Sequence, residues 1–277
     1  MGLIGAIIGD IIGSQYEFHR PDNFDWQNCP LLTDDCEFTD DTVMSIATKI
    51  AIEKYDCDFE KAYKEFGNMY PNVNYGNMFA KWLMGEIESY ESFGNGSAMR
   101  VSYIGECVPK YHKRDLLFDI FPEDLKLINE LAIKSAKCTH NTFSGIRAAV
   151  AVACAIAMAR MGFDKDQIFV CAKYMYQIKS VYTGDENLAE LRYRYHWCDF
   201  ADHTVPIALR CFYESTDYES CMRNCFSLDC DMDTVCCIAG SIAEEYYGTT
   251  GLDNKTILKK YLTPHLYDCI KDLLGER

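Results

Sequence analysis

The amino-acid sequence predicts an all-α protein, and three features of its pattern lead to that expectation. Apolar residues recur at helical spacing along most of the chain. Alternating strand patterns and hairpin dipeptides are scarce, and no linker, low-complexity tract or internal repeat is visible. Hydrophobic residues make up 49% of the 277 residues and aromatic residues 13%, enough for one large core. We therefore expect a single domain over residues 1–277.

The segments with helical spacing are separated by irregular stretches. A final helix follows Thr263-Pro264, which supply an N-cap and a first-turn proline. The predicted helices are Gly2–Gly13, Thr42–Tyr55, Phe59–Met69, Leu125–Lys137, Ser144–Met161, Lys165–Ile178, Val205–Glu214, Tyr218–Phe226, Thr234–Tyr247 and Pro264–Leu274. The predicted irregular stretches are Arg20–Phe38, Tyr70–Gly76, Tyr90–Gly96, Ile104–Pro122 and Tyr182–His203.

The first predicted helix combines regularly spaced glycines with two acids. Gly5, Gly9 and Gly13 are each four residues apart, which allows a neighbouring helix to approach closely. We expect a tightly packed core helix. Asp10 and Glu17 are seven residues apart and are predicted to share a face of this helix. Acids on an apolar stripe are costly unless paired or functional, and a lone one is more often hydrogen-bonded structure than a catalyst.

Net charge excludes one class of function. The chain carries a net charge of −15, and no run of Lys or Arg is longer than two. A general nucleic-acid binder uses a basic patch to neutralise phosphates, so we expect no such binding. The acidity has two explanations: a solvated acidic surface, or carboxylates that converge and hold cations.

Cysteine usage and hydropathy indicate a reduced, cytoplasmic protein that does not cross a membrane. The fifteen cysteines are an odd number without a CxxC pair, which argues against a disulfide framework or a zinc ribbon. The N-terminal apolar run contains Asp10 and has no basic leader, so it is a poor signal peptide. The longest uncharged apolar run, Ala148–Ala159, covers twelve residues, whereas a membrane span needs roughly 20.

Two acidic segments each precede a predicted helix. The first reads Phe38-Thr39-Asp40-Asp41-Thr42. Threonine and aspartate before a helix serve as N-caps, and carboxylates there favour the helix dipole, so capping alone is one explanation. One cap needs one such residue, however, and this segment offers four in a row.

The second segment reads Asp229-Cys230-Asp231-Met232-Asp233-Thr234 and lacks the glycine and distal glutamate of an EF-hand. The same capping explanation applies to it. Together, the two segments could place four carboxylates and two hydroxyls around one point. Two like charges at about 4 Å repel by about 4 kcal/mol at an effective dielectric near 20, so four need a cation. Oxygen ligands suit Mg²⁺ or Mn²⁺, and this many carboxylates favour two metal ions.

A glycine-rich segment and a histidine complete the candidates. Gly94–Arg100 lacks the lysine of a P-loop and the strand of a dinucleotide fingerprint. Its backbone N–H groups could face an anion, with Ser97 beginning a helical segment; the alternative is an ordinary turn. Phe93 could stack on a purine or belong to the core. His140 is a lone histidine, of a kind that is usually structural.

In this order, the segments resemble the ADP-ribosylglycohydrolase family, which includes the dinitrogenase reductase-activating glycohydrolases and the ADP-ribosyl-acceptor hydrolases. The similarity covers roughly residues 1–250, and the motifs are weak alone but specific together. The matching stretches are Gly5–Asp10 through Glu17-Phe18, Phe38–Thr42, Gly94–Val101, Thr139-His140, Thr204–Pro206, and Asp231–Thr234 through Tyr247-Gly248.

The resemblance implies an all-helical orthogonal bundle with a centre of two Mg²⁺ or Mn²⁺ ions. It implies that Glu17 contacts the metals or the scissile linkage. The implied metal ligands are Thr39, Asp40, Asp41, Asp231, Asp233 and Thr234. The implied substrate-binding residues, for the diphosphate, the distal ribose and the adenine, are Phe93, Gly94, Asn95, Gly96, Ser97, Met99 and His140.

The implied activity is hydrolysis of the glycosidic bond between ADP-ribose and an acceptor, for which an ADP-ribosylated protein is the expected partner. Such a bond breaks through an oxocarbenium-like state. Our hypothesis assigns water activation to the metals with Asp41 or Asp233, and proton transfer to Glu17. The acceptor stays open among arginine, serine, a nucleic-acid base and a small molecule, and a monomer is expected.

Two positions depart from the family pattern. The second cluster usually begins Gly-Gly-Asp, but here it begins Asp229-Cys230-Asp231, and Ser102-Tyr103 stands where a proline often follows. Asp and Cys adopt some glycine backbone angles only with strain, and Asp229 would either add a ligand or repel its neighbours. One alternative is therefore a catalytically impaired ADP-ribose binder or crystallin-like structural member. The other is a helical protein whose clusters are only caps.

Overall fold

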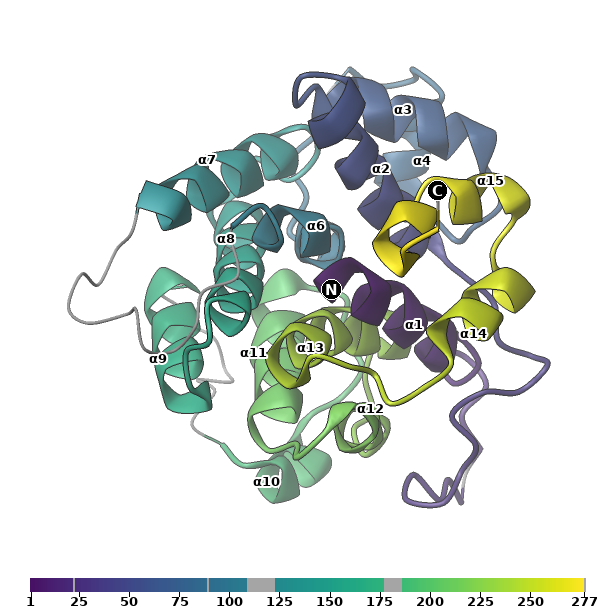
Figure 1. The fold of residues 1–277 in the computed structure, drawn as a ribbon, viewed down its shortest axis with the longest axis vertical. Coiled ribbons are helices and arrows are strands. Elements are labelled where there is room, and N and C mark those ends of the chain that lie inside the picture. Colours follow the sequence, from purple (N-terminus) through teal and green to yellow (C-terminus); the bar gives the residue numbers. More distant parts are fainter. Residues whose placement is uncertain (22, 89, 109–122, 177–185, 277) are drawn as a thin grey trace.

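The computed structural model describes residues 1–276 except 22, 89, 109–122 and 177–185, and the regular secondary structure of these residues is helical apart from two isolated β-bridges. The all-α prediction is confirmed. Figure 1 shows α1 and α13, from opposite ends of the chain, side by side at the centre of the bundle. The helices are α1 Gly2–Ser14, α2 Asp40–Lys54, α3 Phe59–Met69, α4 Asn77–Leu83, α5 Gly96–Met99, α6 Ser102–Gly105, α7 Glu123–Lys137, α8 Phe143–Arg160, α9 Lys165–Tyr176, α10 Leu188–Arg194, α11 Ala201–Tyr213, α12 Tyr218–Phe226, α13 Met232–Tyr247, α14 Asn254–Tyr261, α15 Pro264–Asp268 and the 3₁₀ helix η1 Lys271–Leu274.

Two predictions of secondary structure were wrong. The final helix does not run from Pro264 to Leu274: α15 ends at Asp268, because Ile270 leaves helical geometry (φ −126°, ψ −3°) and buries its side chain before η1 begins. The stretch Tyr182–His203 is not irregular throughout, since it contains α10 and the start of α11. A capping box between Asn187 and Glu190 starts α10. The sequence analysis missed this helix because it is only seven residues long.

Two other predicted ranges extend beyond the described residues. The helix expected over Lys165–Ile178 is described only to Tyr176. In the stretch Ile104–Pro122, the first two residues belong to α6, and residues 109–122 lie outside the described part.

The glycines of α1 allow its backbone to touch the backbone of α13. A Cβ atom on Gly5 would lie 2.5 Å from the Gly240 carbonyl oxygen, and one on Gly13 would lie 2.6 Å from that of Met232. A Cβ on Gly9 would come closer still to the Cys236 carbonyl oxygen. These distances are shorter than van der Waals contact allows, so only glycine fits. The close approach expected from the four-residue spacing is confirmed.

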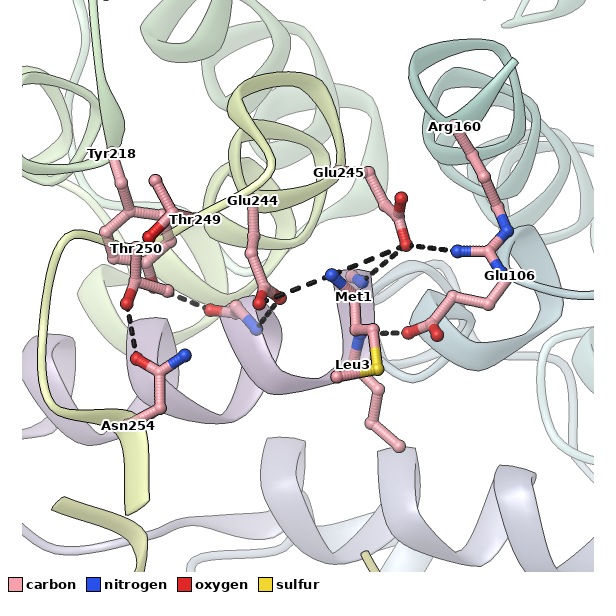
Figure 2. A network of polar contacts seen from close by, with 12 residues as sticks. Met1, Leu3, Glu106, Arg160, Tyr218, Glu244, Glu245, Thr249, Thr250 and Asn254 are labelled. Atoms are coloured by element: carbon pink, nitrogen blue, oxygen red, sulfur yellow. Dashed lines mark hydrogen bonds and ion pairs between the residues drawn. The ribbon is translucent and has the colours of Figure 1, made fainter. Parts of the chain in front are cut away.

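Buried carboxylates hold the N-terminal turn of α1 (Figure 2). The backbone N–H of Gly2 donates to Glu245 at 3.1 Å, and that of Gly5 donates to Glu244 at 2.6 Å. Carboxylates near a helix N-terminus accept hydrogen bonds from the free N–H groups and interact favourably with the positive end of the helix dipole. Arg160 of α8 donates to the same Glu245 at 2.8 Å. The start of α1 is thereby fixed against both α8 and α13.

Helix α8 is long and apolar enough to cross a membrane by length and composition. In the fold, 78% of its residues are buried, and it packs against α7, α9 and α13. Its sequence is rich in alanine from Ala148 to Ala159, whose small side chains let these neighbours approach. The structure therefore places α8 in the core of the bundle, as the sequence analysis expected.

The glycine contact leads to a stability prediction. Gly9→Ala should lower the free energy of unfolding by roughly 1–3 kcal/mol through overpacking, although alanine is the better helix former by about 1 kcal/mol. Gly76→Ala is the matched control, because a Cβ there meets nothing within 4 Å and its φ of −56° suits alanine. Urea denaturation of both variants measures the difference. A Gly9→Ala protein as stable as Gly76→Ala would contradict the proposed close packing.

Candidate metal centre and substrate cleft

Asp10 is the buried group that ties α1 to the start of α2. It is fully buried on α1, and one carboxylate oxygen accepts hydrogen bonds from the Thr39 N–H at 3.0 Å and the Thr42 N–H at 3.1 Å. The hydroxyls of Thr39 and Thr42 donate to the same carboxylate at 2.8 and 2.5 Å. A carboxylate with four donors is a structural anchor, so the reading of Asp10 as hydrogen-bonded structure fits this geometry.

The two acidic segments meet. The Thr234 hydroxyl donates to one oxygen of Asp41 at 3.2 Å, across 193 positions of sequence. The carboxylates of Glu17, Asp231 and Asp233 each place an oxygen within 4.8 Å of the other two. Asp233 lies in the first turn of α13, where its backbone packs against Gly13. The contact between α1 and α13 therefore sets the position of this carboxylate cluster.

Glu17 reaches the cluster from a different place than predicted. Helix α1 ends at Ser14, so Glu17 does not share a helix face with Asp10. It lies in the turn beyond the helix, where the chain bends back towards the start of α13. The prediction of a common helix face was wrong because the apolar spacing continues past the point where helical hydrogen bonding stops.

Capping accounts for only part of the acidic segments. Thr39 is the N-cap of α2, and its hydroxyl accepts from the Asp41 N–H at 3.3 Å. Asp231 stands at the N-cap position of α13 but makes no capping hydrogen bond with its side chain. It accepts instead from the Asn95 amide at 2.7 Å. One oxygen of Asp41 is buried with no hydrogen-bond partner, which a purely structural role does not explain.

The crowded carboxylates cannot all carry a negative charge unaided. Burial first, and then the charges of Asp233 and Asp231, raise the pKa of Glu17 to about 10. Burial and neighbouring carboxylates also raise the pKa values of Asp40, Asp41 and Asp233 well above their usual range. A divalent cation would remove this repulsion. All-oxygen donors and the unpartnered oxygen of Asp41 fit a hard metal ion such as Mg²⁺ or Mn²⁺.

A cleft of about 380 Å³ opens beside the cluster. Its lining combines the acids with the glycine-rich segment, the buried histidine and several aromatic side chains. The lining residues are Glu17, Phe18, Asp40, Asp41, Met44, Asn74, Gly76, Asn77, Met78, Phe79, Tyr90, Ser92, Gly94, Asn95, Gly96, Met99, Arg100, His140, Trp197, Asp199, Asp231, Asp233 and Thr234. Most of the residues expected from the sequence are brought to this one cavity.

The glycine-rich segment is packed against His140. A Cβ on Gly96 would lie 3.2 Å from the imidazole Cε1, and the Ser92 N–H donates to the Thr139 carbonyl at 3.1 Å. Asn95 has a structural role that the sequence did not indicate, because its amide donates to Thr204 at 3.1 Å as well as to the second acidic segment. The loop therefore holds the acids and the histidine in one frame.

Two residues expected at the substrate do not line the cleft. Ser97 is fully buried, and its hydroxyl donates to the Gly145 carbonyl at 2.7 Å. Phe93 exposes 58% of its side chain outside the cleft lining. Aromatic residues that the sequence analysis did not select do line it, namely Phe18, Phe79, Tyr90 and Trp197. Phe18 was within a matching stretch, whereas Trp197 carried no local signal.

Asp229-Cys230, at the start of the second acidic segment, causes neither the backbone strain nor the added ligand or repulsion that the sequence analysis expected. Neither Asp229 nor Cys230 has a positive φ, so the backbone strain expected there is absent. The Asp229 carboxylate is exposed, 4.0 Å from the His196 imidazole, and stays outside the carboxylate cluster. Cys230 is buried in the core.

Comparison with known proteins shows the family and the fold of the chain. The ADP-ribosylglycohydrolase family profile matches residues 1–277. The ADP-ribosylhydrolase ARH3 of Gallus gallus is 24% identical, in a match covering 76% of this chain and 70% of that protein. A solved structure of an ADP-ribosylglycohydrolase-related protein complex shares the fold, with a TM-score of 0.67 and 18% identity over 97% of this chain and 93% of that chain. The chain therefore belongs to the ADP-ribosylglycohydrolase family.

Proposed function

We propose that the protein is a metal-dependent hydrolase that cleaves the glycosidic bond between ADP-ribose and an acceptor, with an ADP-ribosylated protein as its substrate. The observation that carries the proposal is the meeting of two remote acidic segments at the end of one cleft. Family membership supports the reaction class. The proposed ligands of two Mg²⁺ or Mn²⁺ ions are Thr39, Asp40, Asp41, Asp231, Asp233 and Thr234.

The cleft offers separate surfaces for the parts of ADP-ribose. The acidic end suits the ribose that carries the scissile bond, since its vicinal hydroxyls are good metal ligands. The N–H group of Gly96, which lines the cleft, makes no hydrogen bond to another described residue and is left for the diphosphate. Phe18 and Trp197 line the cleft, are 64% and 46% exposed, and offer ring faces for the adenine in place of Phe93.

The chain's own residues account for the proton movements. Bound metals would supply positive charge that polarises water and orients the ribose hydroxyls. Asp41 and Asp233 hold buried carboxylate oxygens at the acidic end of the cleft, where the ribose would lie, and either can accept a proton from the attacking water. Glu17, at the cleft wall beside Asp231 and Asp233, is placed to give a proton to the leaving acceptor atom.

Metal binding gives the first test. Protein treated with EDTA should lose hydrolysis and regain it with Mg²⁺ or Mn²⁺. At one hundred times its Kd the metal should also stabilise the fold by about 2.7 kcal/mol, measured by urea denaturation. Asp233→Ala should abolish both effects.

The matched control for metal binding is Asp229→Ala, four positions earlier in the same segment. Its carboxylate is exposed and outside the cluster, so this variant should bind metal as the wild type does. Equal metal binding by the wild type and by Asp233→Ala, measured by isothermal titration calorimetry, would leave capping as the role of the acidic segments.

The role of Glu17 gives the second test. Glu17→Gln should bind ADP-ribose with unchanged affinity while turnover falls by roughly 10²-fold, the usual scale for a proton-transfer residue. Single-turnover release from ADP-ribosylated arginine, serine and nucleic-acid substrates measures this and identifies the acceptor. Undiminished turnover in the variant would remove Glu17 from the mechanism.

The third test concerns the departure from Gly-Gly-Asp. Because Asp229 is exposed and unstrained, Asp229→Gly should change turnover by no more than about twofold, the scale of a surface substitution. Two results together would establish a catalytically impaired ADP-ribose binder instead. The wild type would bind ADP-ribose tightly but release no product from any substrate, and Asp229→Gly would gain activity.

A further inference from the structure

His140 presents two different environments to its two ring nitrogens. Nδ1 lies 2.8 Å from the Thr139 hydroxyl in the protein interior. The opposite edge of the ring faces Gly96, and Nε2 has no hydrogen bond to another described residue. A neutral imidazole carries its proton on one nitrogen only. The position of that proton decides whether the cleft receives a hydrogen-bond donor or an acceptor.

Arg100 limits what the Thr139 hydroxyl can do. An Nη2 atom of Arg100 donates to the Thr139 oxygen at 3.0 Å and to the Ser135 carbonyl at 2.9 Å. A guanidinium can only donate, so Thr139 uses one lone pair to accept this bond. The hydroxyl proton is then available to the second partner, His140 Nδ1.

The charge of Arg100 favours the same arrangement. Its side chain is 1% exposed and lies over the Tyr63 ring at 4.1 Å, so water screens its charge weakly. Burial and this charge lower the pKa of His140 well below its usual range, which keeps the ring neutral. A nitrogen lone pair, rather than an N–H, is favoured on the side that faces a cation.

Tyr90 also lies beside this network: its hydroxyl is within reach of the Thr139 side chain, and its ring centroid is 6.4 Å from that of His140. Its phenol can donate to the second lone pair of the Thr139 oxygen, which leaves the hydroxyl proton directed at His140. The competing arrangement has Nδ1–H donating to Thr139 and Thr139 donating to Tyr90. In the competing arrangement, the Thr139 oxygen would accept from both the Arg100 guanidinium and the imidazole N–H. These two donors both carry positive charge density and would repel each other.

We propose that Arg100 and Thr139 are positioning residues that hold His140 neutral with its proton on Nε2, so that the cleft receives a hydrogen-bond donor. The ligand group would be an oxygen acceptor of ADP-ribose, and this part of the inference rests on the proposed function. The protonation state of the ring does not rest on it. The sequence alone does not predict this role for Arg100 or Thr139. The chain of hydrogen bonds from Arg100 through Thr139 to His140 forms only because α5 lies against the end of α7.

The test reads the tautomer directly. In full-length protein with ¹⁵N-labelled histidine, long-range ¹H–¹⁵N spectra should show Nε2–H at His140, assigned by the peak that His140→Gln removes. Thr139→Val deletes the hydroxyl at constant shape and should shift the ring to a mixture of tautomers, with ADP-ribose affinity falling roughly tenfold. Thr139→Ser keeps the hydroxyl and should show the spectrum and the ADP-ribose affinity of the wild type.

Two results would overturn the proposal: Nδ1–H in the wild type, or an unchanged spectrum in Thr139→Val. Tyr90→Phe separates the two arrangements, because it removes the acceptor that the competing one requires. The Nε2–H signal should persist in Tyr90→Phe; a wild type that shows Nδ1–H and a Tyr90→Phe variant that shows Nε2–H would establish the competing arrangement instead. If the wild type shows Nε2–H but does not bind ADP-ribose, the proposed function fails while the tautomer assignment stands.

Discussion

Helices α1 and α13 pack with backbone against backbone, and the candidate site depends on that contact. Only glycine leaves room for it, as the carbonyl oxygens of α13 that face Gly5, Gly9 and Gly13 show. The contact lies along the whole of α1 and ends where Gly13 meets Asp233. A larger residue on this face would push the two helices apart and move one acidic segment away from the other. Close packing of two apolar helices thus determines the geometry of a polar site.

The cost of that geometry is a group of buried carboxylates, and they are stabilised in different ways. Asp10 accepts four hydrogen bonds from the start of α2 and is satisfied within the protein. The N-terminal turn of α1 is held by Glu244 and Glu245 in a comparable way. By contrast, Asp41 keeps a buried oxygen without a partner, and Glu17 lies against two other carboxylates. Both Asp41 and Glu17 border the cleft, which is why we assign the metal centre to its acidic end.

The glycine-rich segment links the acidic end of the cleft to its other wall. Asn95 holds Asp231 in place, while Gly96 packs on the imidazole of His140. Behind the imidazole, Thr139 and Arg100 form a buried chain of hydrogen bonds. Both ends of the cavity are therefore built on the rigid interior of the bundle. Such support from behind a site keeps its polar groups in one orientation.

By itself the sequence determined the helices with strong apolar periodicity, the glycine spacing that allows a close approach to α1, and the two Asp/Thr segments as candidates for a site. These features are local, because spacing along a helix and the chemistry of neighbouring side chains can be read from a single segment. Phe59–Met69 and Tyr218–Phe226 were predicted to the residue. Short helices such as α10 were missed, since seven residues contain too little periodicity to recognise.

Only the tertiary structure decided which side chains of each motif face the cleft. Glu17 reaches the acids from beyond the end of α1, Asp229 turns outwards, and Ser97 is buried beneath its loop. Trp197 comes to the cleft from a stretch without any motif. These outcomes depend on where a helix stops and on which elements pack around it. Contacts between residues far apart in the sequence set both, and no local pattern records such contacts.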